Sequence, residues 1–431
     1  MGIEFDWHDA EDERWRHEGD AADWTGHHAQ PQAAPAGRPE RKPKGRTIAA
    51  WRMSDGGLLR TAGYLGLGVL IGTLISAGII YYVAQRNQAL ARADLQAVIN
   101  AEARALAAGD EEIFLALQDD NPSWQEVQRY QLEGRDEART PRELTLTDFV
   151  LLNDVAWATV GYEQDGIRYQ RMQFYHLING QWRRTAPDPV FWGEEKSLET
   201  RNLRFVYHAR DEALVQKLSR WAEEIYSRAA LEFNVGASPH LTFYIDPEPR
   251  PDSPLITEGE FHLASPELTG MRQDGELPIA LSQKTAYNII LRLALEKSGT
   301  RIGASPHEPT IGPNWVVMHG VVYWLLDRLL PDNTAIPGLE ARLHEAASSG
   351  ELMPLSSLWP PYRYGSLQRS ALALAEAHSM VSYLADTTDP GRIPVLLRML
   401  GTTIKPSETM AALGLDFRQF EQAWRAYTLA P

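Results

Sequence analysis

An uncharged apolar stretch near the N-terminus is the feature that most constrains how this chain can fold. Residues 62–83 read AGYLGLGVLIGTLISAGIIYYV and contain no Asp, Glu, Lys or Arg. At about 1.5 Å per residue, a helix of this length spans roughly 33 Å, which matches a bilayer core of about 30 Å. A cleaved signal peptide would start near Met1 and carry a shorter apolar stretch of about 7–15 residues. The sequence therefore predicts a retained transmembrane helix over residues 60–84.

Basic residues flank this predicted span unequally. On the N-terminal side they are Arg41, Lys42, Lys44, Arg46, Arg52 and Arg60, and over a similar distance on the C-terminal side they are Arg86 and Arg92. Because Lys and Arg are enriched on the cytoplasmic side of membrane helices, the N-terminus is expected in the cytoplasm. Everything after Gln85 is then expected outside the cell membrane, with the lipid bilayer as a partner.

Small residues recur at every fourth position within the span, at Gly68, Gly72 and Ser76. Such a row allows two membrane helices to approach closely, so it is compatible with a homodimer. The alternative is that the row has no role in pairing, because glycine is common in membrane helices in general.

Residues 1–57 have the composition of a disordered tail. An acidic part is followed by a stretch of Pro, Gln and Ala and then by a basic run. Segments with charge blocks and few apolar residues cannot bury enough surface to offset the entropy of ordering. Trp7, Trp15 and Trp24 recur through the acidic part. They are read either as a short motif for a cytoplasmic partner or as chance aromatics.

Net charge and cysteine content exclude several classes of function. The formal net charge of −15 argues against a nucleic-acid partner, since binding to phosphates needs clustered Lys and Arg. The chain has no cysteine, which excludes disulfides, thiolate metal sites and thiol nucleophiles.

Residues 86–195 have the pattern of an α+β domain. Leu90–Leu117 shows helical periodicity, although Glu102 interrupts its apolar stripe. After Pro141 the apolar residues alternate with period two, and Asn179-Gly180 is a strong hairpin signal. Helices followed by a curved antiparallel meander predict a cone-like α+β fold.

Two parts of this region resemble the nuclear transport factor-like (SnoaL-like) domains. They are the helix ending at Ala107-Ala-Gly-Asp110 and the segment Phe174-Tyr-His-Leu-Ile-Asn-Gly-Gln-Trp-Arg-Arg184. The resemblance implies a cone that holds a small ligand, a catalytic dyad or nothing. Asp148 and His176 are the candidate acid/base pair in such a cavity. The alternative is that His176 is a surface or merely packed histidine.

The last half of the chain, residues 198–429, predicts a mostly helical domain with a small sheet. Strands are expected at Leu203–His208, Leu241–Ile245 and Leu277–Leu281, with an amphipathic helix over Asp211–Leu231.

Two apolar segments stand at the centre of this half, Ala286–Leu295 and Trp315–Leu326. The first is interrupted only by Asn288 and Arg292, and the second contains His319 followed by Gly320. Helices without a polar face are normally buried in the middle of a domain. Both segments are therefore expected to form the core.

The order of elements resembles the peptidase MA-like domains of the gluzincin zinc peptidases. The matching residues are Phe205-Val-Tyr207, Pro313-Asn-Trp315 and Met318-His319-Gly320. The resemblance implies a helix with an HExxH motif and a later Glu as third zinc ligand. Here the helix reads Leu291-Arg-Leu-Ala-Leu295, and His319 stands near the expected Glu.

The departures from that family concern the chemistry itself. Zinc binding on a helix needs two His one turn apart, with Glu beside the first as the base. Leu291 and Leu295 offer no ligand, and Arg292 is permanently protonated and cannot act as a base. Leu291, Arg292, Leu295 and His319 are thus degenerate site positions, and no catalytic residue, cofactor or metal is predicted.

Three functions are compatible with the sequence. The first is a single-pass membrane protein whose inactive peptidase-like ectodomain binds or scaffolds a peptide or protein at the cell surface. The second is a hydrolase or isomerase that acts from the cone-like domain. The third is a structural subunit of a membrane complex.

Overall fold

The structure is a computed structural model of the 431-residue chain. It describes residues 55–133, 141, 143–236, 240–248, 259–300, 314–330, 335–359, 367–389 and 391–429. The expected tail over residues 1–57 therefore lies almost wholly outside the described residues. The described chain divides into a unit that ends at Ala91 and a larger unit that begins at Arg92.

The first unit consists of the N-terminal part of helix α1 (Asp55–Ala108). Its apolar side chains between Leu67 and Val83 are exposed. Among the described residues, α1 is the one helix long and apolar enough to cross a membrane. Length and composition alone support this property.

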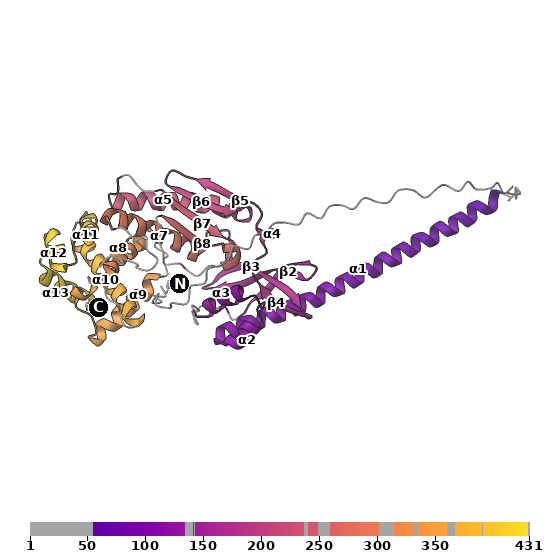
Figure 1. Cartoon of the computed structure of the whole chain (residues 1–431), viewed down its shortest axis with the longest axis horizontal. Coiled ribbons are helices and arrows are strands. Elements are labelled where there is room, and N and C mark those ends of the chain that lie inside the picture. Colours follow the sequence, from indigo (N-terminus) through magenta and orange to yellow (C-terminus); the bar gives the residue numbers. More distant parts are fainter. Residues whose placement is uncertain are drawn as a thin grey trace, which may run out of the picture. The chain divides into compact units, whose positions relative to one another are not determined.

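The described chain is α+β, with thirteen α-helices, two short 3₁₀ helices and two small sheets (Figure 1). After α1 the helices are α2 (Glu111–Ala116), α3 (Pro122–Glu133), α4 (Pro189–Trp192), η1 (Ala209–Asp211), α5 (Glu212–Glu232), α6 (Pro266–Thr269), α7 (Ile279–Ser298), α8 (Trp315–Leu329), α9 (Ala335–Ser349), η2 (Leu355–Leu358), α10 (Leu367–Thr387), α11 (Arg392–Leu400), α12 (Pro406–Ala412) and α13 (Phe417–Thr428). The strands are β1 (Thr145–Leu152), β2 (Val155–Gln164), β3 (Ile167–Ile178), β4 (Gln181–Thr185), β5 (Glu195–Glu199), β6 (Leu203–His208), β7 (Leu241–Asp246), β8 (Glu260–Ala264) and β9 (Met271–Arg272).

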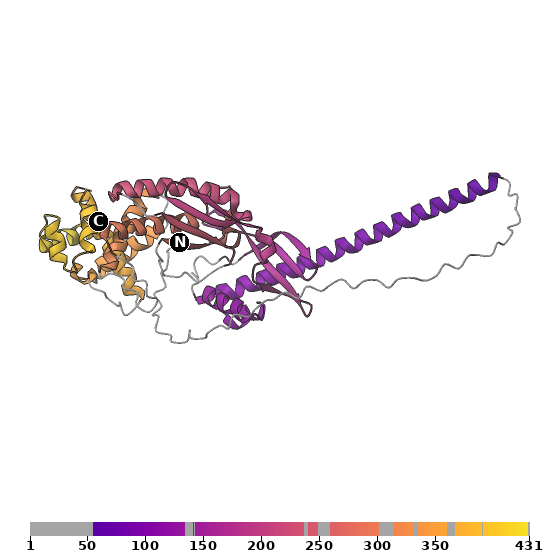
Figure 2. The ribbon, with the colours of Figure 1, turned by 45° about the horizontal axis from the view of Figure 1, so that its top comes forward.

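Two lobes make up the larger unit. The first lobe comprises α1 from Arg92 onward, α2, α3 and sheet A, whose strands β1 to β4 form an antiparallel meander. The predicted hairpin at Asn179-Gly180 is confirmed, because Ile178 pairs with Gln181 across the turn. The C-terminal part of α1 lies against the twisted sheet (Figure 2), where Leu95 and Ile99 are fully buried.

Side chains of α1 also occupy the open edge of β1. The Gln96 amide donates to the Leu144 carbonyl at 2.9 Å and accepts from the Leu146 amide at 2.7 Å, as a neighbouring strand would. The Arg92 guanidinium donates to the carbonyls of Leu146 and Thr147 at 2.8 and 3.2 Å. Edge strands present unpaired backbone groups, so these bonds fix the start of β1 to the helix.

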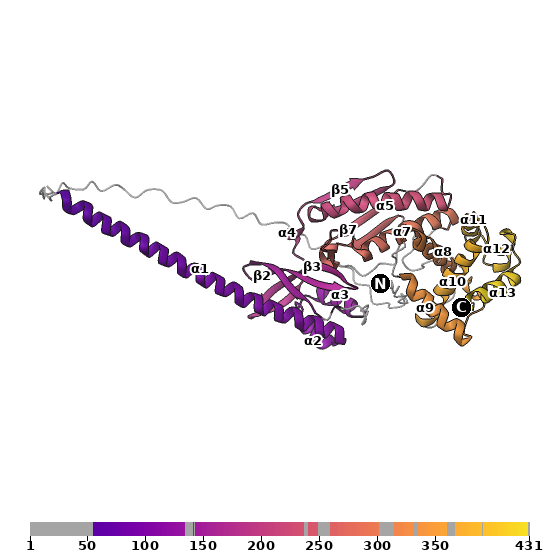
Figure 3. The same cartoon turned by 180° about the vertical axis from the view of Figure 1, so that it is seen from behind.

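The second lobe begins at β5 and contains sheet B, with strand order β5-β6-β7-β8. Strands β6, β7 and β8 run parallel, whereas β5 is antiparallel to β6. Helix α5 runs along one face of this sheet (Figure 3). Helices α7 to α13 come later in the chain and contribute to the same hydrophobic core. The predicted strands at 203–208 and 241–245 are confirmed as β6 and β7.

The predicted strand over Leu277–Leu281 is wrong, because helix α7 already begins at Ile279. Pro278 occupies the N-cap position with φ −59° and ψ 130°. Proline is pre-organised for a helix start and disfavours a helical conformation in the residue before it. The apolar run that follows therefore continues into the buried helix.

A close helix crossing depends on Gly320 in α8. A Cβ atom at this position would lie 2.7 Å from both the carbonyl carbon and the oxygen of Ala377 in α10. Real Cβ atoms do not approach backbone so closely, so only glycine lets the two helices pack at this distance. The crossing brings α8 into the main core of the second lobe, with Val317, Val321 and Leu325 fully buried.

Candidate functional site

The candidate positions on α7 identified from the sequence, Leu291, Leu295 and Arg292, do not form a polar site. Leu291 and Leu295, one turn apart on α7, are each only 1% exposed. The Arg292 side chain is 20% exposed, and its guanidinium lies 3.6 Å from the Glu296 carboxylate one turn further along α7. The first two positions thus lie in the core, and the third makes a local ion pair.

His319 is enclosed by aromatic rings. It is 3% exposed, its Nδ1 is 2.5 Å from the Tyr287 hydroxyl, and its ring centroid lies 4.2 Å from that of Trp315. Burial lowers the pKa of His319 to about 3. The imidazole is therefore neutral at physiological pH and serves as a hydrogen-bonded core side chain.

Asp148 and His176 are not hydrogen-bond partners. Asp148 is exposed on β1 and accepts from the Phe149 amide at 2.9 Å. His176 lies at the rim of sheet A, with Nε2 3.0 Å from the Asp154 carboxylate and Nδ1 3.8 Å from that of Asp119. The bond from His176 lowers the pKa of Asp154.

Strand register also places both residues on the face of sheet A that α1 does not cover. Asp148 pairs with Thr159, and Phe174 pairs with Trp157. His176 is two residues beyond Phe174 on β3 and therefore lies on the same face. Trp157 and Phe174 pack edge-on against Phe191 of α4, with ring centroids 5.4 and 5.2 Å away. This face is aromatic, and Asp148 and His176 do not converge on an enclosed polar site.

The enclosed polar groups of the first lobe lie on the opposite face, under α1. Glu102 of α1 is 2% exposed and receives a hydrogen bond from the Arg184 guanidinium of β4. Arg184 is itself 9% exposed, and its strand neighbour Tyr175 is fully buried. A charged pair at this depth is unusual and requires further hydrogen bonds to compensate for its desolvation.

Gln173 links this pair to a second arginine. With its amide oriented to satisfy its neighbours, Nε2 donates to the Tyr175 hydroxyl at 2.8 Å. Oε1 then accepts from Arg184 at 3.2 Å and from Arg171 at 3.1 Å. We call Glu102, Arg171, Gln173, Tyr175 and Arg184 the polar cluster. The Arg171 guanidinium also stands 5.6 Å from the ring centre of Tyr162.

Burial and mutual charge govern the ionisation of the polar cluster. Burial raises the pKa of Tyr175 well above its usual value, and the adjacent Glu102 adds to the effect. Burial lowers the pKa of Arg171, as does the neighbouring Arg184. Burial is the largest influence on Arg184 and lowers its pKa, but the charge of Glu102, the nearby Tyr175 and the hydrogen bond to Glu102 together raise it above its usual value. Glu102 Oε2 has no hydrogen-bond partner among the described residues. The cluster therefore combines two guanidinium groups with a single carboxyl group, one oxygen of which has no hydrogen-bond partner among the described residues.

The sequence carried one signal for this cluster. Glu102 interrupts an otherwise apolar helical stripe, and a carboxylate facing a core must find a cation. Its partner lies 82 residues away on β4, and Arg171 and Gln173 look like ordinary alternating strand residues. Only strand pairing places them on the face beneath α1.

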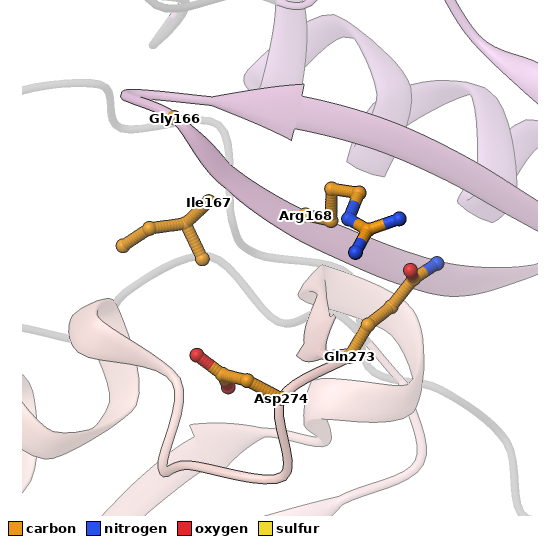
Figure 4. Close-up of a pocket in the computed structure, with 5 residues that line it drawn as sticks. All are labelled: Gly166, Ile167, Arg168, Gln273 and Asp274. Atoms are coloured by element: carbon orange, nitrogen blue, oxygen red, sulfur yellow. The ribbon is translucent and has the colours of Figure 1, made fainter.

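A shallow depression of about 300 Å³ lies where the β2–β3 turn meets the turn after β9 (Figure 4). It is lined by Gly166, Ile167, Arg168, Gln273 and Asp274, none of which is buried. Without a buried polar group, it lacks the fixed donors and acceptors of a ligand site.

Potential metal ligands do not gather in the part of the chain that the structure describes, where no group of three or more His, Asp or Glu is placed to hold an ion. No known protein family matches the sequence, and no curated protein matches it either. The candidate sites therefore rest on their own geometry.

Loss of the Glu102 carboxylate should destabilise the first lobe strongly. Glu102→Leu leaves the Arg184 guanidinium buried without its counter-charge, which typically costs about 3–5 kcal/mol. The double variant Glu102→Leu/Arg184→Met removes both charges and should lose clearly less than the sum of the single variants. Denaturant unfolding of the full chain in detergent measures these differences.

Glu111→Leu is the matched control, because Glu111 makes an exposed ion pair with Arg129 at 3.5 Å. Such surface pairs contribute at most about 1 kcal/mol. If Glu102→Leu were as mild as Glu111→Leu, the cluster would not be the electrostatic core described above.

Proposed function

We propose that this chain is a single-pass membrane protein whose extracytoplasmic part acts by binding a peptide or protein partner and not by zinc-dependent hydrolysis. In this proposal the first lobe is a SnoaL-like cone, and the second is a peptidase MA-like domain that has lost its zinc site. The N-terminal tail would face a cytoplasmic partner, and Gly68, Gly72 and Ser76 would offer a face for a homodimer.

The membrane anchoring is supported by α1 and by the charges around it. The helix is apolar and exposed between Leu67 and Val83, and six basic residues lie ahead of this stretch, between Arg41 and Arg60. Basic residues are retained on the cytoplasmic side, which favours an extracytoplasmic C-terminal part.

Topology can be tested directly because the chain has no native cysteine. Thr25→Cys places a thiol in the tail, and Ser348→Cys places one at an exposed position of α9. A membrane-impermeant maleimide is expected to label Ser348→Cys in intact cells and Thr25→Cys only after permeabilisation. The reverse labelling pattern would refute the proposed orientation.

One observation carries the binding role for the second lobe. Where a related peptidase would hold zinc, Leu291 and Leu295 fill the core at 1% exposure, and His319 is neutral, buried and bonded to Tyr287. Hydrolysis would need an open position at the metal for water and substrate. An apolar core offers neither, whereas a folded surface can still bind a partner.

Zinc analysis tests this directly. The purified full chain, incubated with zinc and desalted, should retain far less than stoichiometric metal, and 1,10-phenanthroline should leave its thermal unfolding unchanged. Leu291→His/Leu295→His, with two imidazoles one turn apart, is the positive control for metal detection. Stoichiometric zinc in the wild type, with peptide hydrolysis lost on chelation, would overturn the proposal.

A second candidate function lies in the first lobe and is favoured by the polar cluster. Two arginines, a glutamine amide and a tyrosine hydroxyl converge under α1 with a single carboxylate among them. A net positive, buried hydrogen-bonding site suits a small carboxylate ligand. Glu102 would then be the group available to accept a proton in a hydrolase or isomerase reaction.

A thermal-shift screen with acetate, succinate and benzoate tests this second candidate. A carboxylate that binds the cluster should raise the unfolding temperature of the wild type but not of Arg171→Met. Arg168→Met is the control, because Arg168 is exposed and lies outside the cluster. Equal shifts in the wild type and Arg171→Met would rule out binding at the cluster.

A further inference from the structure

Residues 265–275 connect the two lobes, and we call this segment the clasp. It leaves the end of β8 in the second lobe, forms the single turn of α6 and continues as β9, which pairs with β3 of sheet A. The clasp therefore carries backbone from one lobe into the sheet of the other.

Contacts with the first lobe are made by the far end of the clasp. Met271 and Arg272 of β9 pair with Gln170 and Tyr169, and the Gln273 amide donates to the Arg168 carbonyl at 3.0 Å. The Tyr162 hydroxyl donates to the Thr269 carbonyl at 3.0 Å. Because β9 has only two residues and makes few bonds to the first lobe, we expect these contacts to depend on how the near end of the clasp is held.

Gly270 shows how tightly the clasp fits against Tyr162. Its φ is +136°, and a Cβ atom would lie 2.2 Å from the Tyr162 hydroxyl oxygen. A side chain here would be strained and would also displace that ring. Tyr162 in turn lies beneath the guanidinium of Arg171, so the clasp ends beside the polar cluster.

The near end of the clasp is anchored by a buried pair, Ser265 and Asp211. Ser265 is fully buried, and its hydroxyl donates to Asp211 Oδ1 at 2.8 Å while accepting from the Glu267 amide at 3.2 Å. Asp211 is 2% exposed at the junction of β6 and α5. Its other oxygen, Oδ2, has no hydrogen-bond partner among the described residues.

Three charged or titratable groups face Asp211 from the elements around it. Glu267 of α6 raises the pKa of Asp211, whereas His208 of β6 and Arg210 of η1 lower it. Arg210 lies 3.5 Å from the Glu267 carboxylate, so their opposing effects are coupled. Burial is the largest influence on Asp211 and raises its pKa to about 7, although the hydrogen bond from Ser265 favours the ionised form and lowers the pKa.

We propose that the clasp is a protonation-controlled latch between the lobes, closed when Asp211 is neutral and loosened when Asp211 is ionised. Burying Oδ2 without a hydrogen-bond partner costs less free energy when the Asp211 carboxyl is neutral. The bond to Ser265 can then persist, and it holds the clasp so that β9 stays paired with β3. An ionised carboxylate needs more donors than Ser265 supplies, and opening the clasp lets water reach it.

The sign of the pH dependence follows from linkage. Closed Asp211 has its pKa raised to about 7 and open Asp211 has an ordinary pKa near 3.8, so the closed form binds the proton more tightly. The opening equilibrium should therefore rise by up to about tenfold per pH unit between these values and level off above pH of about 7.

Hydrogen exchange of the full chain in detergent, corrected for intrinsic rates, measures this opening in peptides that cover residues 266–276. The wild type is expected to lose protection from pH 5 to pH 7 and then level off. Asp211→Asn, which cannot ionise, should show much less dependence of protection on pH than the wild type, with any remainder due to Glu267, whose pKa burial also raises. Gly270→Ala should open the clasp at every pH.

Glu376→Gln is the matched control. Burial raises the pKa of Glu376 to about 7 as well, but its carboxylate accepts from the Met353 amide, outside the clasp. This variant should keep the wild-type profile over residues 266–276. A flat wild-type profile would overturn the proposal. So would an unchanged profile in Asp211→Asn, since the carboxyl would then be only a structural contact.

Discussion

The packing of α8 against α7 and α10 is the constraint on which the second lobe depends. Both α7 and α8 are apolar nearly all round, so each must be covered on every side by other elements. Gly320 permits the backbone contact with Ala377, and the residues around it are fully buried. This packing also encloses Leu291 and Leu295, which are each 1% exposed.

The first lobe differs from the second because its interior contains charged side chains. Glu102 and Arg184 come from α1 and β4 and meet beneath the helix, with Gln173, Tyr175 and Arg171 around them. Replacing such a group with apolar side chains would often be neutral or stabilising. One oxygen of the Glu102 carboxylate also has no hydrogen-bond partner among the described residues. The two lobes therefore differ in their interiors: the second has an apolar core, and the first encloses a charged, hydrogen-bonded cluster.

Much of the architecture followed from pattern alone. The apolar span, the two central helices, the strands at 203–208 and 241–245 and the Asn179-Gly180 hairpin each have a local signal of period, length or turn chemistry. The expected strand at 277–281 failed because a proline and a short apolar run fit both a strand and a helix start. Asp148 and His176 have the residue types of an acid/base pair, but strand register puts them on the face of sheet A away from α1, where they do not form a hydrogen bond with each other.

By itself, the sequence determined which segments are apolar, which positions lack a zinc ligand and that Glu102 breaks a buried stripe. These properties depend only on residue type and local spacing. Only the tertiary structure decided that Glu102 meets Arg184, that Asp211 is buried against Ser265 and that β9 joins the sheet of the other lobe. The physical reason is that burial and pairing depend on contacts between residues 50 to 110 positions apart, such as Tyr162 with Thr269 at a separation of 107. No local pattern encodes the strand register and helix crossing that create them.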